Sequence, residues 1–351
     1  MEALDNKCPA CGAKINFNPK NQKWDCEYCG SKFTLEEMKK YNNASNDKVN
    51  KTKEKPIKKL DNLDVYRCKN CGAEVMADET TTSTFCVYCG STAILKDRIT
   101  DGIAPTKIIP FKNVKEDAIK AFKGLSKGRP LMPKFFNDSK NIEKISGVYI
   151  PFWAYDLKVS GNIDFNATDT TTWSDYNYRY VKTDTYLSKR NSTMNFEKIL
   201  VDGSSRFDDD LMDSLEPFNL SDLVEYNHAY LSGFLAEKYD VDSDKAIERA
   251  DQRAMNSAVD VTKETVKHQT AIVASNSLEV SKIKDDYILL PVWMVNIKYK
   301  EKNYTFAMNG QTGEIVGNIP IDITRTIIIS LTLFIIIGLL IFLILWLGGS
   351  S

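Results

Sequence analysis

Two copies of one cysteine pattern begin the chain, and they constrain its fold more than any other feature. The stretch CPACGAKINFNPKNQKWDCEYCG, residues 8–30, holds two CxxC pairs with fourteen residues between them. A CxxC pair places two sulfurs on one tight turn, and two such turns near this spacing are typical of a four-cysteine zinc site. A glycine follows the second cysteine of each pair, where positive φ favours the turn.

The pattern recurs at residues 68–90, at a constant offset of 60 positions, and the two copies contain all eight cysteines of the chain. We therefore expect two structural Zn²⁺ ions, each held by four thiolates. The predicted ligands are Cys8, Cys11, Cys26 and Cys29 for the first ion, and Cys68, Cys71, Cys86 and Cys89 for the second. A closed four-thiolate site has no open coordination position, so no reaction is expected at either metal.

Disulfides, redox pairs and iron–sulfur ligation are alternatives that remain open for eight cysteines. Against them, the N-terminus MEALDNK has no apolar segment for secretion, and neither copy has the βαβ context of a thioredoxin-like CxxC. Each copy of the cysteine pattern is expected to form a zinc ribbon, a small unit of about thirty residues. A unit of this length is too short to bury a self-sufficient core, so metal binding is expected to drive its folding. Trp24, Phe33 and Phe85 are predicted to form the small apolar caps of the ribbons.

A polar stretch rich in Asn and Lys, residues 42–62, separates the two ribbons and is typical of a flexible linker. Its lysines raise the possibility of nucleic-acid binding. However, the whole chain has 46 Lys plus Arg against 47 Asp plus Glu, a formal net charge of -1. A dedicated nucleic-acid binder normally carries a clear basic excess, so nucleic acid is not the expected partner.

The far end of the chain is strongly apolar. Residues 326–347 contain no charged side chain, and a helix of this length spans about 33 Å, enough to cross the hydrocarbon core of a bilayer. Arg325 precedes the segment and only GGSS follows it, which favours a cytoplasmic N-terminal side. Zinc-binding thiolates also require a reducing compartment. We expect a single-pass protein of the cell membrane, in contact with lipid, with its N-terminal body in the cytoplasm.

The middle of the chain shows both helical and strand periodicity. A helix is predicted at residues 113–125, starting with a capping box between Asn113 and Glu116. A longer helix is predicted at residues 243–274. The residues expected near one face of that helix are Ala246, Ala250, Ala254, Ala258 and Val261.

Several stretches have the alternation of β-strands. Residues 162–187 are predicted to form antiparallel strands, and residues 304–317 a hairpin around Asn309-Gly310. Trp153 and Trp293 begin two strands of the same phase, each two residues after a proline. This similarity indicates either an internal duplication or two neighbouring strands of one sheet. Both tryptophans are expected to be core anchors.

No catalytic motif is found in the chain. His228 and His268 have no partner at a recognisable spacing, and P-loop, GxGxxG, GxSxG and HExxH patterns are missing. The run Asp208–Asp210 raises the possibility of a cation site, but such runs are usually solvated loops. We therefore predict no catalytic residue and do not expect an enzyme.

Together these features predict a multidomain chain in five parts. The parts are zinc ribbon 1 at residues 1–37, a flexible linker at 38–64, zinc ribbon 2 at 65–97, an α+β cytoplasmic domain with antiparallel strands at 98–322, and one C-terminal transmembrane helix at 323–348.

This order of features, with the segments GVYIPFWAYD and LLPVWMVNIKYK between the ribbons and the terminal helix, resembles the TFIIB-type zinc-ribbon membrane proteins of low-GC Gram-positive bacteria. The resemblance implies a membrane-anchored adaptor that acts with a membrane partner protein and recruits SPFH-like and PspA-type proteins in an envelope-stress response. Only the eight cysteines carry over as functional positions. The alternative is a membrane-tethered nucleic-acid-binding protein related to replication or transcription.

Overall fold

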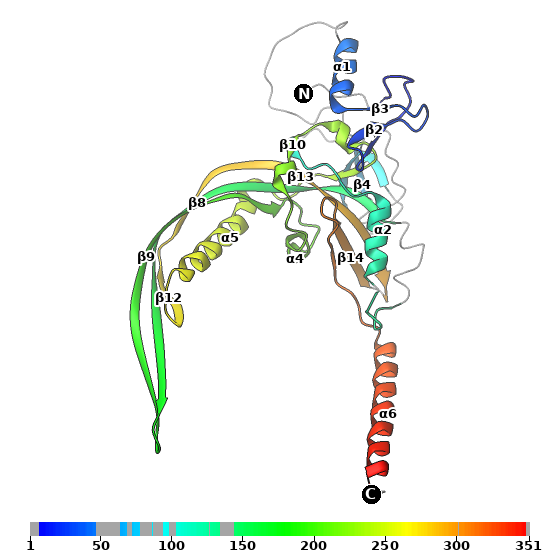
Figure 1. Ribbon diagram of the computed structural model, residues 1–351. Helices are drawn as coiled ribbons and strands as arrows, with labels where there is room; N and C mark the ends of the chain where they lie inside the picture. The colour runs from blue at the N-terminus through cyan, green and yellow to red at the C-terminus, as the bar shows by residue number, and fades with distance from the viewer. Residues whose placement is uncertain are drawn as a thin grey trace.

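The computed structural model shows a β-rich body with one helix projecting from it (Figure 1). The residues that it describes are 7–46, 64–68, 72–77, 86, 94–97, 103–125, 127–133, 144–300 and 302–348. The strands are β1 (Asn16–Asn18), β2 (Lys23–Asp25), β3 (Lys32–Phe33), β4 (Asp64–Cys68), β5 (Glu74–Ala77), β6 (Ile94–Asp97), β7 (Lys107–Ile108), β8 (Ser146–Ser174), β9 (Arg179–Asp202), β10 (Val224–Glu225), β11 (Leu235–Glu237), β12 (Thr270–Asn276), β13 (Glu279–Tyr299), β14 (Lys302–Asn309) and β15 (Ile315–Gly317). The helices are α1 (Leu35–Asn46), α2 (Lys115–Gly124), α4 (Asp209–Asp213), η2 (Leu220–Asp222), η3 (His228–Leu231), α5 (Ser243–Glu264) and α6 (Ile323–Gly348).

The described strands form a three-stranded sheet, β1-β2-β3, and a 12-stranded sheet that is mainly antiparallel. In the large sheet β8 lies between β13 and β11, and β5 joins β11 so that β4, β5 and β6 continue the sheet. These last three strands come from the region of the second cysteine motif. The predicted α+β architecture with antiparallel strands is therefore confirmed, and the second motif contributes strands to the body.

The two tryptophan-containing strands are neighbours. β8 and β13 pair antiparallel, with Pro151 opposite Leu289 and Pro291 opposite Tyr149. Of the two explanations for their similar patterns, the structure shows adjacency in one sheet. Both tryptophans are buried, and the indole of Trp153 donates a 2.8 Å hydrogen bond to the Val241 carbonyl. They are core anchors, as expected.

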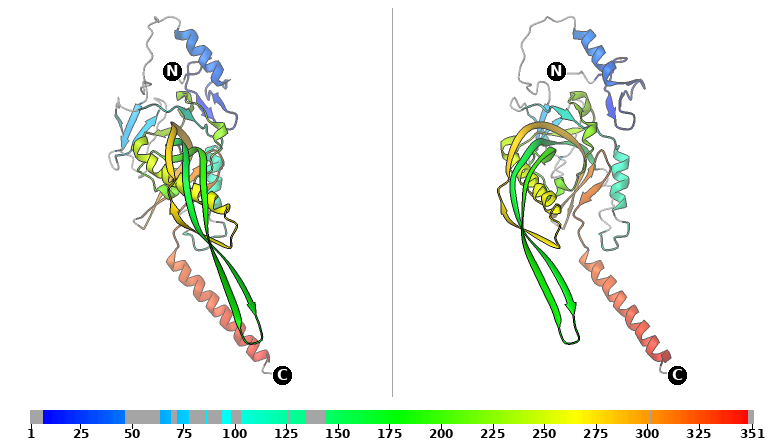
Figure 2. Two further views of the ribbon diagram at one scale, coloured as in Figure 1. Left: turned by 90° about the vertical axis from the view of Figure 1, so that its left-hand side faces the viewer. Right: turned by 60° about the vertical axis from the view of Figure 1, so that its left-hand side comes forward.

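The strands β8, β9, β12 and β13 curve into an arch, and α5 lies on its concave side (Figures 1 and 2). The helix contacts the sheet through residues spaced four apart, whose small side chains allow close approach. These buried residues are Ala246, Ala250, Ala254, Ala258 and Thr262. Val261 is about half exposed, so its predicted place on this face is wrong.

The predicted helix over residues 243–274 is too long. The helix α5 ends at Glu264, and β12 then pairs antiparallel with residues 163–168 of β8. β12 contains the β-branched residues Ile272 and Val273, which fit a pleated surface well. The open edge of β8 supplies the hydrogen bonds that make a strand more stable than a further helical turn there.

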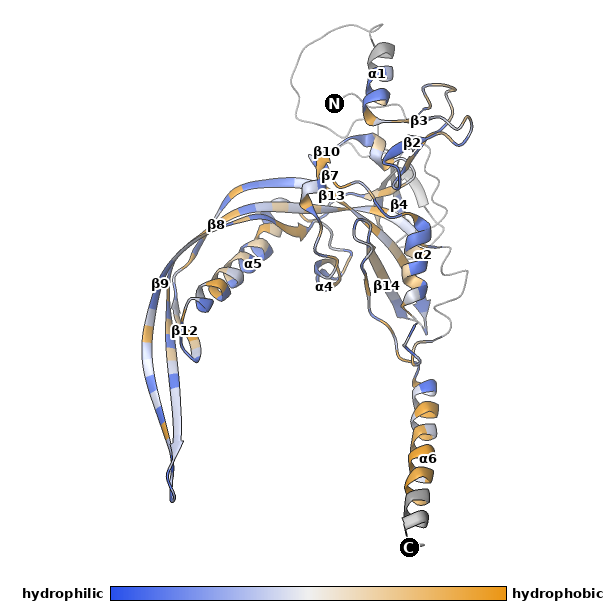
Figure 3. Cartoon of the chain, viewed as in Figure 1, coloured by the Kyte–Doolittle hydropathy of each residue, from blue (hydrophilic) through white to orange (hydrophobic). Residues whose placement is uncertain are grey.

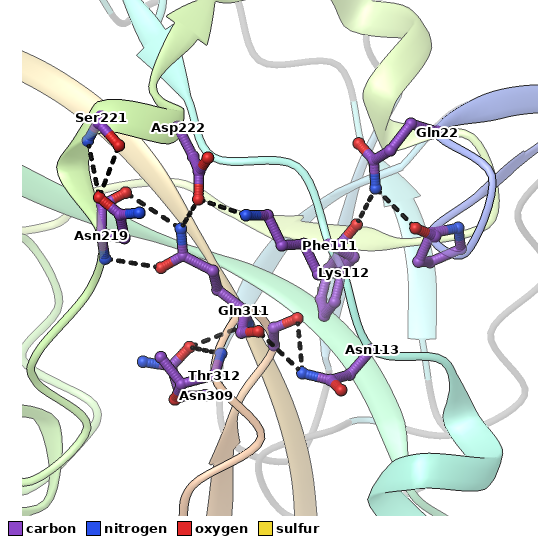
Figure 4. Close-up of polar contacts among 12 residues, drawn as sticks. Gln22, Phe111, Lys112, Asn113, Asn219, Ser221, Asp222, Asn309, Gln311 and Thr312 are labelled. Carbon is purple, nitrogen blue, oxygen red and sulfur yellow. Dashed lines mark hydrogen bonds and ion pairs between the residues drawn. The ribbon is translucent and has the colours of Figure 1, made fainter.

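The start of α2 also differs from the prediction. Val114 occupies the N-cap, and its N–H donates to the Asp117 carboxylate at 3.2 Å, so the expected Asn113–Glu116 box is wrong by one position. The Asn113 side chain instead donates to the carbonyls of Gly310 and Gln311, in the turn between β14 and β15 (Figure 4). That turn joins two antiparallel strands, which confirms the predicted hairpin.

The helix α6 is apolar and extends away from the body without packing against it (Figures 1 and 3). Its segment Ile323–Phe342 has a mean hydropathy of 2.5 and is 0% buried. Near its start, the Arg325 guanidinium donates a 2.7 Å hydrogen bond to the Met132 carbonyl. The helix is therefore long and apolar enough to span a membrane, and it is attached to the body at its first turn.

Candidate metal centre

The four cysteines of the first motif meet at one point. The sulfurs of Cys8, Cys11, Cys26 and Cys29 all lie within 4.8 Å of one another. The Cys8–Cys29 and Cys11–Cys26 sulfur pairs are each 3.6 Å apart, far longer than a disulfide bond. Ligands about 2.3 Å from a tetrahedral Zn²⁺ are separated from one another by about 3.8 Å. The geometry and the thiol donor set therefore fit a metal of this kind.

Two similar turns build this cluster. Gly12 donates its N–H to the Cys8 carbonyl at 2.8 Å, and Gly30 donates to the Cys26 carbonyl at 2.9 Å. Both glycines have positive φ, +75° and +73°, which a side chain would disfavour. Each turn holds one buried and one exposed cysteine, since Cys8 and Cys26 are buried and their partners are exposed.

One cysteine has an environment suited to ligation. The Ser31 hydroxyl lies 3.3 Å from the Cys29 sulfur. Together with the Ser31 backbone amide, it lowers the pKa of the Cys29 thiol to about 6. The thiolate is the form that binds metal, so this contact favours ligation by Cys29. For Cys11 the Ala13 amide lowers the pKa of the thiol, but burial and the neighbouring thiols outweigh it and raise that pKa to about 12.

The second motif is described in part. Cys68 and Cys86 are both buried and cluster with Ala73, whereas Cys71 and Cys89 lie outside the described residues. The turn at Cys68 repeats the turn at Cys8: Cys68 N–H donates to Ala73, Gly72 N–H donates to Cys68, and Gly72 has a φ of +71°. The structure thus brings together two of the four cysteines predicted for the second site.

The cysteine cluster belongs to a ribbon, residues 7–33, that is docked on the body through aromatic rings. Trp24 is only 1% exposed, and its indole donates a 2.9 Å hydrogen bond to the Ala229 carbonyl in η3. Its ring centroid lies 5.0 Å from that of Phe17 and 5.2 Å from that of Tyr230. Trp24 was predicted to lie in an apolar cap within the ribbon, and this contact with the body was not predicted. Phe85 lies outside the described residues.

A second contact extends this docking surface. The Gln22 side chain donates to the Phe111 carbonyl at 2.8 Å and to the Pro19 carbonyl at 2.6 Å (Figure 4). The Phe111 ring stacks on Phe234 at 4.2 Å and packs edge-on against Trp293. The ribbon therefore contacts the segment that carries Phe111, whose ring belongs to the aromatic core of the large sheet. Together with the Trp24 contact, this hydrogen bond holds the ribbon in a fixed position on the body.

The acidic run has a structural role. Asp208 caps α4 by accepting from the Asp210 N–H at 2.9 Å, and Asp209 forms a 3.0 Å ion pair with Arg249. The candidate cation site there is thus occupied by a guanidinium. His268 stacks on Tyr186 and lies 2.9 Å from the Asp169 carboxylate. No catalytic arrangement is seen among the described residues around these side chains.

Arg249 links several carboxylates to α5, and its loss is expected to destabilise the body. It pairs with Asp202 at 2.8 Å and with Asp213 at 3.0 Å. Burial raises the pKa of Asp202 to about 6, although the hydrogen bond from Arg249 and its charge act to lower that pKa. Arg249→Ala should lower the free energy of unfolding by about 2–3 kcal/mol, somewhat less than for a fully buried pair, because Arg249 is partly exposed. Chemical denaturation followed by circular dichroism would measure this loss.

The matched control is Lys245→Ala, at an exposed position of the same helix, which should change stability little. Adding Asp202→Asn to Arg249→Ala should recover part of the loss, because the buried group is then neutral. A double variant as unstable as the single variant would contradict this account.

Comparison with known proteins gives one informative relative. The chain is 34% identical over 319 residues to YdjG of Bacillus subtilis strain 168, a protein described as uncharacterized. The match covers 91% of this chain and 90% of the relative. No protein-family model and no solved structure matches the chain.

Proposed function

The chain belongs to the family of Bacillus subtilis YdjG, and on this premise we propose that it is a membrane-anchored zinc-ribbon adaptor. In this proposal two ribbons each hold one structural Zn²⁺, α6 crosses the cell membrane once, and the body lies in the cytoplasm. The adaptor recruits cytoplasmic partner proteins to the membrane surface. It carries out no chemistry at its metals.

The observation that carries the proposal is the orientation of the first ribbon. Its aromatic side is buried against η3 through Trp24, whereas its metal end is open to solvent, with Cys11 and Cys29 exposed and Tyr28 84% exposed. A closed metal site on a fixed support presents a rigid surface with little conformational entropy to lose on binding. Such a surface suits recognition of a protein.

The second ribbon is proposed from the repeat. The turn at Cys68 has the same hydrogen bonds as the turn at Cys8, and Cys86 is buried beside it. Four thiolates at the repeated spacing would complete a site like the first one. Because β5 pairs with β11, this ribbon would also be held by the body.

The partners follow from the resemblance to TFIIB-type zinc-ribbon membrane proteins. It supports recruitment of an SPFH-like protein, and through it a PspA-type protein, during envelope stress, together with a membrane partner protein. Nucleic acid is a weaker candidate, because Phe17 and Trp24 are buried against the body and are not available to stack on bases. The near-neutral charge of the chain agrees with this preference.

Capture of partners by the tagged full-length protein from detergent extracts tests the proposal. Mass spectrometry should identify an SPFH-like or PspA-type protein in the complex. Tyr28→Ala, Tyr88→Ala or the double variant should reduce this capture without changing zinc content, since both tyrosines occupy the same position of the repeat. Tyr41→Ala, at an exposed position in α1, is the matched control.

Two results would contradict the adaptor. One is the absence of both partner types while the protein is folded and zinc-loaded. The other is binding of DNA or RNA by the purified protein at low salt with a steep loss as salt rises, which would favour the nucleic-acid alternative.

A further inference from the structure

The β8–β9 hairpin projects from the body toward the same end of the molecule as α6 (Figures 1 and 2). β12 pairs only with residues 163–168 of β8, so the remainder of the hairpin extends past its neighbour. The two strands stay in register as far as Ser174 opposite Arg179. A long two-stranded arm thus extends from the body toward the same end of the molecule as α6, well separated from that helix (Figure 1).

The tip of this arm is rich in exposed aromatic side chains. Tyr176 is 100% exposed, Tyr178 is 67% exposed and Trp173 is 49% exposed. Trp173 stacks on Tyr180 with ring centroids 5.6 Å apart. Four large aromatic rings within eight residues would be costly to leave in water unless something covers them.

The turn that presents these rings is well ordered by its own hydrogen bonds. The Asp175 carboxylate accepts from the N–H groups of Asn177 and Tyr178, at 2.9 and 2.7 Å. Its second oxygen accepts from the Tyr180 hydroxyl at 2.8 Å. The aromatic group is therefore pre-organised at the tip, which reduces the entropy lost when it binds.

We infer that this aromatic tip, Trp173 to Tyr180, rests in the headgroup layer of the membrane that α6 crosses. The inference depends on the membrane anchor of the proposed function. Trp and Tyr are the side chains enriched at membrane–water interfaces, where the ring contacts acyl chains and the polar atom stays hydrated. The direction of the arm places them at the end of the molecule that faces the bilayer.

The polarity of the arm limits how deep the tip enters. Asp175, Arg179 and Lys182 lie at or near the tip, and the hydropathy colouring of the hairpin is largely hydrophilic, in contrast to α6 (Figure 3). Charged side chains and open strand edges are excluded from lipid-facing hydrocarbon. The tip therefore stays among the headgroups. With the tip at that depth, the axis of α6 is tilted from the membrane normal. Transmembrane helices commonly tilt, by about 20° and up to about 40°.

Such a contact would fix the orientation of the whole body on the membrane. A single helix leaves the body free to rotate about the helix axis, whereas a second contact at the end of the arm removes that freedom. The arch would then stand over the lipid surface, supported at α6 and at the tip.

The depth of Trp173 in a bilayer tests the inference. The full chain has five tryptophans, and Trp24, Trp153 and Trp293 are buried in the body. The protein is reconstituted in nanodiscs of zwitterionic phosphatidylcholine, with and without lipids brominated near the headgroup end of their chains. The double variant Trp173→Phe/Trp346→Phe keeps only the three buried tryptophans and gives the background fluorescence. Subtracting this background from the fluorescence of Trp346→Phe leaves the signal of Trp173. The difference between Trp173→Phe and the double variant isolates Trp346.

We expect brominated lipid to quench both Trp173 and Trp346, and the bilayer to shield Trp173 from acrylamide. Tyr176→Ser/Tyr178→Ser should lose most of the quenching of Trp173. Leu187→Ser, also exposed but on the arm farther from the tip, should leave it unchanged.

Quenching of Trp346 without quenching of Trp173 would overturn the inference and leave the anchor intact. Quenching of neither would show that α6 is not inserted, which would overturn the anchor itself. Shielding of Trp173 from acrylamide only after a membrane protein is added would show that the tip binds protein, and this would also overturn the lipid contact.

Discussion

A Cys26→Ser variant is expected to lose one equivalent of bound zinc and the folded structure of the first ribbon. Cys26 is buried and its sulfur lies 3.6 Å from that of Cys11, so the substitution removes one of the four clustered sulfurs. Structural zinc contributes about 10 kcal/mol or more to the folding of small metal-binding units. The β1-β2-β3 sheet has little core of its own, and it should open when the metal is lost.

Elemental analysis and limited proteolysis of the full-length protein would measure these effects. The variant should contain one zinc fewer and be cleaved within residues 7–33, whereas Ala10→Ser, at an exposed position between the first two cysteines, should behave like the parent. Unchanged zinc content would show that the four sulfurs do not bind this metal. Opening of the ribbon by a reductant, but not by a chelator, would indicate disulfides instead.

Trp24→Ala is expected to release the first ribbon from the body while leaving its metal bound. The substitution removes a side chain that is 1% exposed, its hydrogen bond to Ala229 and its contacts with Phe17 and Tyr230. Large-to-small changes of buried tryptophan cost about 3–5 kcal/mol. Hydrogen exchange should therefore increase in η3 and in residues 16–25, at unchanged zinc content.

Two further variants separate the parts of this contact. Trp24→Phe keeps an aromatic ring but removes the donor to the Ala229 carbonyl, so it should cost about 1–3 kcal/mol. Tyr28→Ala, on the exposed end of the same ribbon, should cost less than about 0.5 kcal/mol. If hydrogen exchange in η3 is the same in Trp24→Ala as in the parent, the docking contact does not hold the ribbon in solution.

The features that could be predicted from the sequence are those encoded by spacing along the chain. The first cysteine cluster follows from two short turns, each closed by a glycine at positive φ. The apolar helix α6 follows from composition alone, because backbone hydrogen bonds in a helix are made between residues four apart. The β14–β15 hairpin follows likewise from the Asn-Gly signal in its turn.

Predictions were wrong where a distant part of the chain changed the outcome. Residues 270–276 continue the predicted helix in sequence but form β12, because the edge of β8, about a hundred residues earlier, offers hydrogen-bond partners. The N-cap of α2 is Val114 and not Asn113 as predicted, because the side-chain amide of Asn113 donates a hydrogen bond to the Gly310 carbonyl. The acidic run Asp208–Asp210 is exposed, as expected, but its ion pair between Asp209 and Arg249, forty positions away, was not predicted.

The sequence by itself therefore determined the cysteine cluster, the apolar helix and the class of the central domain. Tertiary structure alone decided that Trp24 faces the body, that β8 and β13 lie side by side, and that the aromatic arm points toward the same end as α6. The physical reason is the range of the interactions. Turns and helices are stabilised by neighbours in the chain, whereas docking surfaces and sheet order depend on which distant apolar faces meet and exclude water.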